Sequence, residues 1–412
     1  MKILILSQFA GSRKHGMVLR NYQWAKTLTE MGHDVTIMAS SYAHARYKQP
    51  VVDGNVSTEH IDGIRYFWIK GTKSYNPSSI IGRLSSMFWF TLKSYVIARR
   101  HKRKYDIVIA SSPQPLVIFA ARFLAKKNKA KLVFDIRDLW PLSLMELSKS
   151  GSYNPLIWLM QRAENYACSR ADLITAVPQN CEPYLKEHGL ADNKFLHVPN
   201  GFVESNLNLE NHKKPPQDYI DHIDMLRKNG AFFVGYTGSL GEANAMDKFL
   251  EAMAQVDDKV HCVIVGKGAK KEALKAQAYD LKINHRVHIF DSIESDQMHH
   301  FLKNIDLAYV GTRKKKLYDY GASVTKMNDY MFAKRPVLYA IGDPNNTVEL
   351  SECGVSCEAE NVSEIAAGIE KFYKMTPAQR AKYGEKGCKY LLKNNLISIH
   401  MNKMLMVLNV KK

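Results

Sequence analysis

Residues 1–39 read MKILILSQFAGSRKHGMVLRNYQWAKTLTEMGHDVTIMA, and they decide the fold. The apolar run at 2–6 predicts a buried strand, the amphipathic stretch at 19–31 predicts a helix, and the apolar run at 34–39 predicts a second strand. Gly32 follows the helical stretch, and glycine readily adopts the left-handed conformation that ends a helix. A strand, a helix and a strand in this order form a βαβ unit, which indicates a parallel sheet.

The same alternation continues along both halves of the chain. Further elements are predicted in the first half as strands at 107–110 and 131–134 and a helix at 116–126, and in the second half as strands at 232–236, 261–265, 287–290 and 307–310 and helices at 246–256 and 269–281. Because 412 residues exceed what one hydrophobic core accommodates, the chain should divide into two domains. We predict an α/β domain at 1–204, a polar linker at 205–229 with a short helix at 220–228, a second α/β domain at 230–376, and a helical segment at 377–412 that packs toward the first domain.

The composition is that of a soluble globular protein with excess positive charge. Lys and Arg number 58 against 40 Asp and Glu, and the net charge of +18 attracts polyanions such as nucleic acid, anionic lipid and pyrophosphate. The six cysteines form no CxxC pair, so reduced and mostly buried thiols are expected. The apolar N-terminal run is too short for a signal peptide, and no apolar run reaches the roughly 20 residues that cross a bilayer. We expect a cytoplasmic protein.

Four glycine-containing loops follow predicted strands, at 10–16, 237–241, 265–268 and 321–325. Small residues in such loops allow backbone N–H groups to approach phosphate oxygens. None of the loops matches a Walker motif or a complete GxGxxG motif, and a single loop of this kind is more often plain turn chemistry. The loops alone therefore leave both interpretations open.

The most informative stretch is 320–337, which reads YGASVTKMNDYMFAKRPV and predicts a loop, a helix and a strand. Either Ser323 or Thr325 can cap the helix. Lys326 falls in the first turn, where a cation opposes the helix dipole unless an anion binds nearby. This conflict indicates a site for a pyrophosphate.

The stretch 320–337 resembles the donor-site signature of family 4 GT-B glycosyltransferases, particularly the WbuB-like branch that builds bacterial surface polysaccharides. Three other stretches resemble the same family: the loop, helix and strand entry from Gly16 to Val35, the motif DIRDLWP at 135–141, and VPNG at 198–201. The similarity covers nearly the whole chain. It implies the GT-B fold, in which two Rossmann-like domains face each other across a cleft, and it implies retaining transfer of a sugar from a nucleotide donor.

The resemblance also implies roles for residues of the donor site. Asp329 matches the acidic residue at the end of the family's paired-glutamate motif, which usually binds the ribose, and Gly321 stands where the first glutamate is expected. The contact to the sugar hydroxyls must therefore differ here or come from another loop. The amides of 322–325 are implied to hold the sugar and the phosphates, and this loop includes Ser323, Val324 and Thr325.

The cations that the family usually carries after the first strand of its second domain are absent. Ser239 and Asn244 occupy the places of an arginine and a lysine, so another cation must stabilise the charge of the departing diphosphate. Lys326 is the first candidate, and Lys267 and Arg313 follow. The remaining residues predicted to contact the donor are Gly16, Gly238, Gly241, Asn244 and Gly266. No metal is expected to be required.

Arg137 and Asp138 are the candidate residues for contact with the acceptor. Many family members have a histidine where this chain has Arg137. Asp138 can orient or deprotonate the acceptor hydroxyl, or the two residues can form a structural salt bridge, and Arg137 can instead meet a phosphate. Family members that resemble this chain retain the anomeric configuration with help from the donor phosphate, so no nucleophile is assigned.

Residues 80–103 combine apolar and aromatic side chains with several arginines and lysines. Such a helix either lies among the headgroups of an anionic membrane or packs its apolar face on the first domain. We favour peripheral association with the inner face of the cytoplasmic membrane, because the net positive charge and a lipid-linked acceptor would both place the protein at an anionic membrane surface.

These observations lead to one hypothesis and two alternatives. The hypothesis is a retaining transferase that moves an N-acetylated amino sugar, such as N-acetyl-fucosamine, from a UDP donor to a lipid-linked saccharide in the synthesis of O-antigen or capsule. One alternative is a sugar-nucleotide 2-epimerase on the same fold. The other is a basic nucleic-acid-binding protein, for which the sequence offers charge but no recognition motif. We expect no nucleic-acid partner and no cofactor besides the nucleotide sugar.

Overall fold

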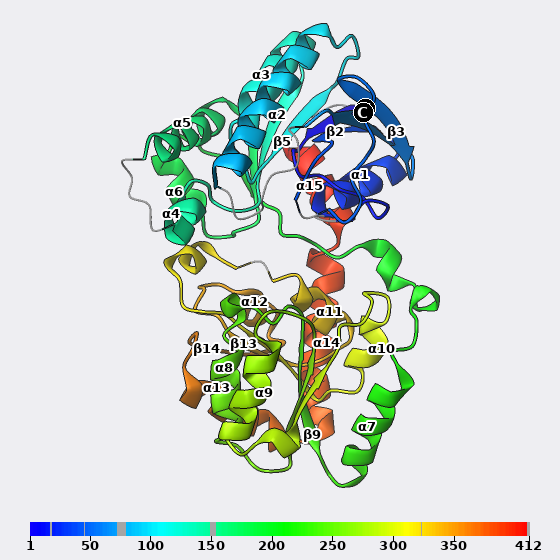
Figure 1. The fold of residues 1–412 in the computed structure, drawn as a ribbon, viewed down its shortest axis with the longest axis vertical. Helices are drawn as coiled ribbons and strands as arrows, with labels where there is room; N and C mark the ends of the chain where they lie inside the picture. Colours follow the sequence, from blue (N-terminus) through cyan, green and yellow to red (C-terminus); the bar gives the residue numbers. More distant parts are fainter. Residues whose placement is uncertain (17–18, 45, 72–79, 149–153, 323, 410–412) are drawn as a thin grey trace. The chain divides into compact units, whose positions relative to one another are not determined.

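The computed structural model describes residues 1–16, 19–44, 46–71, 80–148, 154–322 and 324–409 (Figure 1). The chain divides into two compact units, of which the first comprises Met1–Asn200 and Ile397–Lys412 and the second comprises Gly201–Leu396. Each unit contains one sheet, and helices cover it. The predicted α/β architecture with two parallel-sheet domains is confirmed.

Within the described ranges, the first unit is built on an eight-stranded sheet with the order β3-β4-β2-β1-β5-β6-β7-β8. Its strands are β1 (Lys2–Leu6), β2 (Asp34–Ser40), β3 (Val56–Ile61), β4 (Ile64–Ile69), β5 (Ile107–Ser111), β6 (Lys131–Ile136), β7 (Leu173–Ala176) and β8 (Phe195–His197). The central strand β1 runs parallel to its neighbours, so that Ile3 lies opposite Val35 of β2 and Ile107 of β5. These three side chains are buried, which explains why their apolar runs predict the strands.

The helices of the first unit are α1 (Arg20–Glu30), α2 (Ile80–Arg100), α3 (Val117–Asn128), α4 (Leu142–Ser148), α5 (Pro155–Arg170), α6 (Glu182–Glu187) and α15 (Ile397–Val407). Helix α1 buries Trp24 and Leu28 and packs on β2 and α15 (Figure 1). Helix α3 packs between α2 and α5. The three helices α2, α3 and α5 therefore form a row.

In the described residues, the second unit is built on a six-stranded sheet, wholly parallel, with the order β11-β10-β9-β12-β13-β14. Its strands are β9 (Phe232–Thr237), β10 (Val260–Val265), β11 (Val287–Phe290), β12 (Leu307–Gly311), β13 (Val337–Ala340) and β14 (Gly354–Cys357). Its helices are α7 (Gln217–Lys228), α8 (Met246–Met253), α9 (Lys271–Asp280), α10 (Met298–Leu302), α11 (Lys326–Phe332), α12 (Thr347–Ser351), α13 (Val362–Tyr373) and α14 (Pro377–Asn394). The predicted strands and helices of this half are therefore confirmed.

The second sheet is buried on both faces, as expected for parallel strands. On one face Tyr236 packs with Phe249 of α8 and Phe372 of α13. On the opposite face Phe233 packs with Tyr330 of α11 and other side chains of α10, α11 and α14. Because successive strand residues point to opposite faces, the two cores share the same strands.

The domain boundaries differ from those expected from the sequence. The predicted linker at 205–229 belongs to the second unit, because α7 lies within it and Ile223 of that helix is fully buried in the core. The predicted C-terminal segment at 377–412 is split between the units, since α14 packs on α11 and α12 while only α15 joins the first unit. Gly384 allows this packing of α14, because a Cβ there would lie 2.0 Å from the carbonyl oxygen of Lys334.

All six cysteines are free, and only Cys357 is partly exposed, in agreement with the expected buried thiols. Across the described ranges, none of the helices combines the length and the apolar character that crossing a bilayer requires.

Candidate active site

Two loops at the carboxyl edge of the second sheet pack directly on each other. In parallel α/β sheets this edge is where ligands bind. Gly238 follows β9 and Gly266 follows β10, and a Cβ at Gly266 would lie 1.9 Å from the carbonyl oxygen of Gly238. The amide of Leu240 donates to the carbonyl of Lys267 at 2.9 Å, which joins the same two loops. The close backbone approach explains the glycine at 266.

Lys326 lies above this loop pair at the start of α11. Its Nζ is 3.8 Å from the ring centre of Tyr236, and a Cβ at Gly238 would lie 2.9 Å from the same Nζ. Burial lowers the pKa of Lys326 to about 7. Throughout the described part of the chain, no carboxylate forms an ion pair with this ammonium. A desolvated cation without an anion is costly by itself, so the site has a strong electrostatic demand for a bound anion.

Asp329 follows Lys326 by three residues on the same helix. Burial raises the pKa of Asp329 to about 7, and no cation in the described residues pairs with its carboxylate. The next residue, Tyr330, fixes α11 against β9, because its hydroxyl accepts a hydrogen bond from the amide of Thr237 at 2.9 Å. The helix α11 therefore holds two ionisable groups, Lys326 and Asp329, at a fixed place beside β9, and neither forms an ion pair in the described residues. Perturbed pKa values of this kind are typical of functional sites.

Asn328, between these two groups, fastens α11 to both ends of the second unit. Its Nδ2 donates to the carbonyl of Gly201 at 2.7 Å, and its Oδ1 accepts from Nδ2 of Asn395 at 2.6 Å. The amide of Phe202 in turn donates to the carbonyl of Asn395 at 2.8 Å. Because the buried Asn328 satisfies both halves of its amide in this way, it serves to position α11.

Ser239 and Asn244, which stand in place of the family's usual cations, bond to each other. The Nδ2 of Asn244 donates to the carbonyl of Ser239 at 3.0 Å and to its hydroxyl at 3.2 Å. The bond closes the loop around Gly241 without adding charge. Lys267, the next candidate cation, is exposed to solvent.

Arg313 does not offer a free cation, contrary to its ranking as a candidate from the sequence. Its guanidinium forms ion pairs with Glu242 at 2.6 Å, Asp247 at 2.8 Å and Glu360 at 2.9 Å. Burial alone would lower the pKa of Arg313, but hydrogen bonds to the three carboxylates outweigh it and raise the pKa. Arg313 therefore ties three loops together, and its charge is already neutralised.

We expect Arg313→Ala to affect stability more than nucleotide binding. The substitution leaves three carboxylates close together without their common cation, so the free energy of unfolding should fall by about 1–3 kcal/mol. Thermal denaturation measures this loss, and titration with UDP tests the second half of the expectation. A variant of unchanged melting temperature that binds UDP tenfold more weakly would return Arg313 to the list of donor-binding cations.

One backbone amide of the loop at 321–325 is already bonded to another part of the protein. The N–H of Ala322 donates to Oδ2 of Asp343 at 3.0 Å. The expected cap by Thr325 is absent, because its side chain makes no capping hydrogen bond, and Ser323 lies outside the described residues. Asp343 was not among the residues predicted from the sequence, where its only signal is its place a few residues after the stretch 320–337.

In the first unit, Arg137 and Asp138 follow β6. Burial raises the pKa of Asp138, and Arg137 and Arg20 partly oppose this effect. Burial lowers the pKa of Arg137, and Asp135 and Asp138 oppose it. No direct ion pair joins Arg137 to Asp138 in the described ranges, so their geometry does not support a structural salt bridge. The amide of Arg137 donates to Oγ of Ser112 at 2.8 Å, which fixes the backbone there.

The first acidic residue of the same motif, Asp135, has a structural role that the sequence did not reveal. It is fully buried and pairs with Arg20 of α1 at 2.9 Å. Arg20 also donates to the carbonyl of Val198 at 2.8 Å and to that of Pro199 at 2.7 Å. This network ties α1 to β6 and to the end of the first unit.

Gly16 closes the loop that follows β1. Its φ of +76° lies in the left-handed region, and a Cβ there would lie 2.2 Å from the ring of Tyr47. His15, just before it, is buried, and its Nδ1 lies 3.0 Å from Oγ of Ser12. The glycine is therefore required by the conformation of the loop itself.

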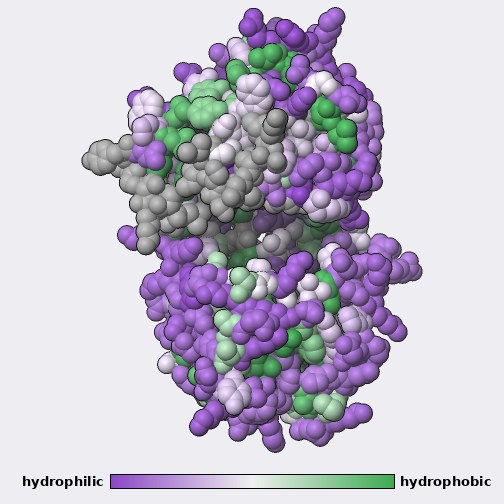
Figure 2. Space-filling model, in the orientation of Figure 1, coloured by the Kyte–Doolittle hydropathy of each residue, from purple (hydrophilic) through white to green (hydrophobic). Residues whose placement is uncertain are grey.

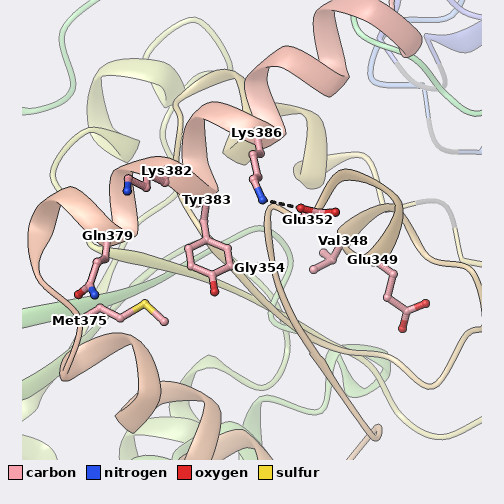
Figure 3. A pocket seen from close by; sticks show the side chains of 9 residues that line it. All are labelled: Val348, Glu349, Glu352, Gly354, Met375, Gln379, Lys382, Tyr383 and Lys386. Carbon is pink, nitrogen blue, oxygen red and sulfur yellow. Dashed lines mark hydrogen bonds and ion pairs between the residues drawn. The ribbon is translucent and has the colours of Figure 1, made fainter.

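A groove of 520 Å³ lies elsewhere in the second unit, between α12, β14 and α14 (Figure 3). Glu352 and Lys386 form an ion pair on one side, and Tyr383 points between the two helices (Figure 3). None of its lining residues belongs to the loops around Gly238 and Gly266. The groove is thus separate from the candidate donor site.

Two protein-family models match the sequence. The description "Glycosyltransferase Family 4" applies to residues 15–205, and the description "Glycosyl transferases group 1" applies to residues 220–390. The chain belongs to the family 4 GT-B glycosyltransferases. The first match falls on the unit with Arg137 and Asp138, and the second falls on the unit with Lys326 and Asp329.

Several solved structures have a similar fold. For the sucrose-phosphate synthase tll1590 from Thermosynechococcus elongatus, the identity is 14%, the match covers 98% of each chain and the TM-score is 0.71. For HepE from Anabaena in complex with UDP-glucose, these values are 16%, 98% of each chain and 0.63. For WaaG, a glycosyltransferase involved in lipopolysaccharide biosynthesis, they are 13%, 100% of each chain and 0.65. No curated protein sequence matches the chain.

The structure brings together only part of the predicted site of this glycosyltransferase. Gly238 contacts Gly266 and lies beside the ammonium of Lys326. Gly241, Asn244, Lys267 and Asp329 lie on the same loops or helix. Gly16, Arg137 and Asp138 belong to the other unit. The roles of all these residues in binding or catalysis stay predictions.

Proposed function

We propose that this glycosyltransferase transfers a sugar from a UDP donor to a lipid-linked saccharide, with retention of the anomeric configuration. The observation that carries the proposal is the ammonium of Lys326, which lies over Tyr236 beside Gly238 without an anionic partner among the described residues. A diphosphate supplies the missing negative charge. The similar structure of HepE contains UDP-glucose, which supports UDP as the nucleotide.

In the proposed reaction, the bond between the anomeric carbon and the diphosphate oxygen breaks, and a bond to the acceptor oxygen forms on the same face. The acceptor proton passes to the departing phosphate, so no carboxylate nucleophile is needed. Lys326 stabilises the negative charge that develops on the diphosphate, as preorganised donors do in other enzymes. Asp329 accepts hydrogen bonds from the ribose hydroxyls. Arg137 and Asp138 are proposed to orient the acceptor or its phosphate.

The sugar is proposed to be an N-acetylated amino sugar such as N-acetyl-fucosamine, used in O-antigen or capsule synthesis. This part of the proposal rests on the resemblance of residues 320–337 to the WbuB-like branch. The similar protein WaaG acts in lipopolysaccharide biosynthesis, which is consistent with an acceptor of the cell surface.

A panel of nucleotides tests the donor assignment. We expect UDP and its sugars to raise the melting temperature of the protein, and we expect ADP, GDP and CMP to raise it less. At a ligand concentration of 100 times Kd, the stabilisation amounts to about 2.7 kcal/mol. Indifference to every nucleotide would contradict the donor assignment. Conversion of the donor to an epimer without any acceptor would support the epimerase instead.

The affinity for UDP is expected to decrease as the pH rises above 7. Since burial lowers the pKa of Lys326 to about 7, the free protein loses this positive charge between pH 7 and 8.5. Binding then requires uptake of a proton, so Kd should rise by up to about tenfold per pH unit in this range. Isothermal titration at several pH values measures the slope. Lys326→Arg keeps its charge throughout and should flatten it, whereas an equal slope in that variant would exclude Lys326 as its source.

The membrane is the proposed location of the acceptor, and the first unit offers a suitable surface. Exposed apolar side chains follow the row of three helices: Trp89, Leu92 and Val96 of α2, Phe119 of α3 and Trp158 of α5. We call them the aromatic patch. Figure 2 shows apolar surface gathered on this side of the first unit. Exposed cations lie on the same helices, namely Arg99, Arg100, Lys126, Lys127 and Arg162.

The charge on these helices has one sign. Helices α2 and α3 contain no acidic residue, and Glu164 of α5 is buried. The guanidinium of Arg162 lies 4.9 Å from the ring centre of Trp158, so apolar and cationic groups are adjacent. Aromatic rings with neighbouring cations suit the headgroup region of an anionic membrane, which supports peripheral association with the inner face of the cytoplasmic membrane.

A flotation assay tests the membrane proposal. We expect the protein to float with vesicles that contain anionic lipid at low salt, and to float poorly with zwitterionic vesicles. Replacing Trp89, Phe119 and Trp158 by serine should abolish flotation. Tyr279→Ser removes an aromatic ring of the second unit that is even more exposed than these three, and it serves as the control. Failure of the wild-type protein to float with anionic vesicles would overturn the proposal.

A further inference from the structure

Asp343 is a buried carboxylate at the ligand-binding edge of the second sheet. It follows β13 by three residues, and only 5% of its surface is exposed. The loop that carries it is held by backbone contacts, because its amide donates to the carbonyl of Ile341 at 2.8 Å and Nδ2 of Asn346 donates to its carbonyl at 3.3 Å. The side chain is thus fixed beside the loop at 321–325.

The two oxygens of this carboxylate have different surroundings. Oδ2 accepts a hydrogen bond from the amide of Ala322 at 3.0 Å, whereas Oδ1 is buried and makes no hydrogen bond. A buried carboxylate oxygen without a donor is costly, and native structures rarely keep one without a reason. A hydroxyl group is the neutral donor that satisfies such an oxygen most directly.

The pKa of this carboxyl group favours its ionised form near pH 7. Burial raises the pKa of Asp343 to about 6, and Glu349 adds to this effect. The amide of Ala322 opposes it, as does the hydroxyl of Tyr339, which lies near the carboxylate but makes no hydrogen bond of ordinary geometry with Oδ1. In the residues that the structure describes, no cation forms an ion pair with it. The group therefore remains an acceptor for hydrogen bonds near pH 7.

The position of Asp343 matches a gap in the donor site. Gly321 has no side chain to offer, and its φ of +102° lies in the left-handed region that disfavours other residues. The carboxylate of Asp343 bonds to the very next amide in the chain. Asp343 therefore places a negative charge beside Gly321, where the loop itself has no acidic side chain.

We propose that Asp343 binds a hydroxyl group of the donor sugar and thereby selects the sugar. The inference rests on the proposed UDP-sugar donor. Oδ2 holds the loop at Ala322, and Oδ1 accepts the sugar hydroxyl once the donor is bound. Asp343 thus contacts the sugar and leaves the nucleotide to Lys326 and Asp329.

The test compares UDP with the UDP-sugar that stabilises the wild-type protein most, by isothermal titration. In Asp343→Asn the side chain keeps its shape and its acceptor for Ala322, but an amide NH₂ replaces the second carboxylate oxygen. We expect Kd for UDP to stay within about twofold, and Kd for the UDP-sugar to rise by about tenfold, as for the loss of one charged hydrogen bond. Glu385→Gln removes an exposed carboxylate from helix α14 of the same unit and serves as the control of equal charge change.

A merely structural role would give a different pattern. If Asp343 only anchored the loop, UDP and the UDP-sugar would weaken by the same factor, and this outcome would overturn the proposal. So would a UDP-sugar affinity equal to that of the wild type. As a second readout, the advantage of the UDP-sugar over UDP should shrink in the wild type as the pH falls below about 6, and Asp343→Asn should lack this dependence. Absence of UDP binding by the wild type would instead refute the proposed function, and this inference with it.

Discussion

Lys326→Ala is expected to weaken UDP binding by about 10- to 100-fold and to lower the rate of sugar transfer by about 10²- to 10³-fold. The first loss corresponds to one charge-assisted hydrogen bond to the diphosphate. The second is larger, because negative charge on the leaving group increases in the transition state. Titration with UDP and a turnover assay with the preferred UDP-sugar measure the two effects separately.

The same substitution should not destabilise the free protein. The charged form of Lys326 is disfavoured by burial, and its lowered pKa means that this cost is present below about pH 7 and disappears as the pH rises toward the value of an unfolded lysine. Removing the ammonium therefore removes a cost at neutral pH. Lys326→Met, which keeps the apolar stem over Tyr236, should melt at or above the wild-type temperature at pH 7.

Lys382→Ala is the matched control, since it removes an exposed lysine of the groove in Figure 3. It should leave UDP affinity unchanged. If Lys326→Ala bound UDP as the wild type does, Lys326 would not be the cation of the donor site, and Lys267 would remain as the next candidate. A large fall in melting temperature in both Lys326 variants would show that the residue is structural.

The sequence was sufficient where local pattern determines structure. Central strands such as β1 and β10 are short apolar runs buried on both faces, and this pattern is visible without tertiary information. The strand β3 was missed because it lies at the sheet edge and is mostly half-exposed, so its residues carry no apolar run. The strand β4 was missed as well, although it lies inside the sheet and is largely buried. Likewise β7, with the four residues LITA, is too short to give a signal.

The domain boundary and the fate of Arg313 depend on contacts between residues distant in the chain. The helix α14 lies on the second unit because Gly384 and Gly387 allow close approach to Lys334 and Cys353, and a polar helix sequence does not reveal its partner. Arg313 was a candidate cation for the donor, yet the carboxylates that neutralise it come from the segment at 242–247 and from Glu360, both distant in the chain.

Only part of the candidate site could be predicted, because the rest again depends on contacts between residues distant in the chain. Lys326 stood out because a cation in the first helical turn conflicts with the dipole, and the structure adds that it is desolvated over Tyr236. Asp343 could not be found, because an acidic residue after a strand is common and only folding brings it to Ala322. The need of the site for a bound anion therefore arises from the fold more than from the sequence motif.

Gly266→Ala is expected to cause a large structural effect near the site. The added Cβ would lie 1.9 Å from the carbonyl oxygen of Gly238 and 3.1 Å from its carbonyl carbon. Both are backbone atoms, so neither can turn away as the end of a side chain can, and the two loops must separate. Overpacking of this kind costs about 1–3 kcal/mol or more. For a unit of this size the melting temperature should fall by about 2–12 °C.

The same displacement should remove UDP binding, because Gly238 lies beneath the ammonium of Lys326 and the loop would move with it. Thermal denaturation and titration with UDP check the two effects. Gly241→Ala is the matched control for stability, since no atom lies within 4 Å of its added Cβ and its φ of −112° suits any residue. If Gly266→Ala melted like the wild type and bound UDP normally, the contact between the two loops would not support the donor site. A loss confined to Gly266→Ala would show instead that backbone packing of the loops, together with Lys326, builds the place where the diphosphate binds.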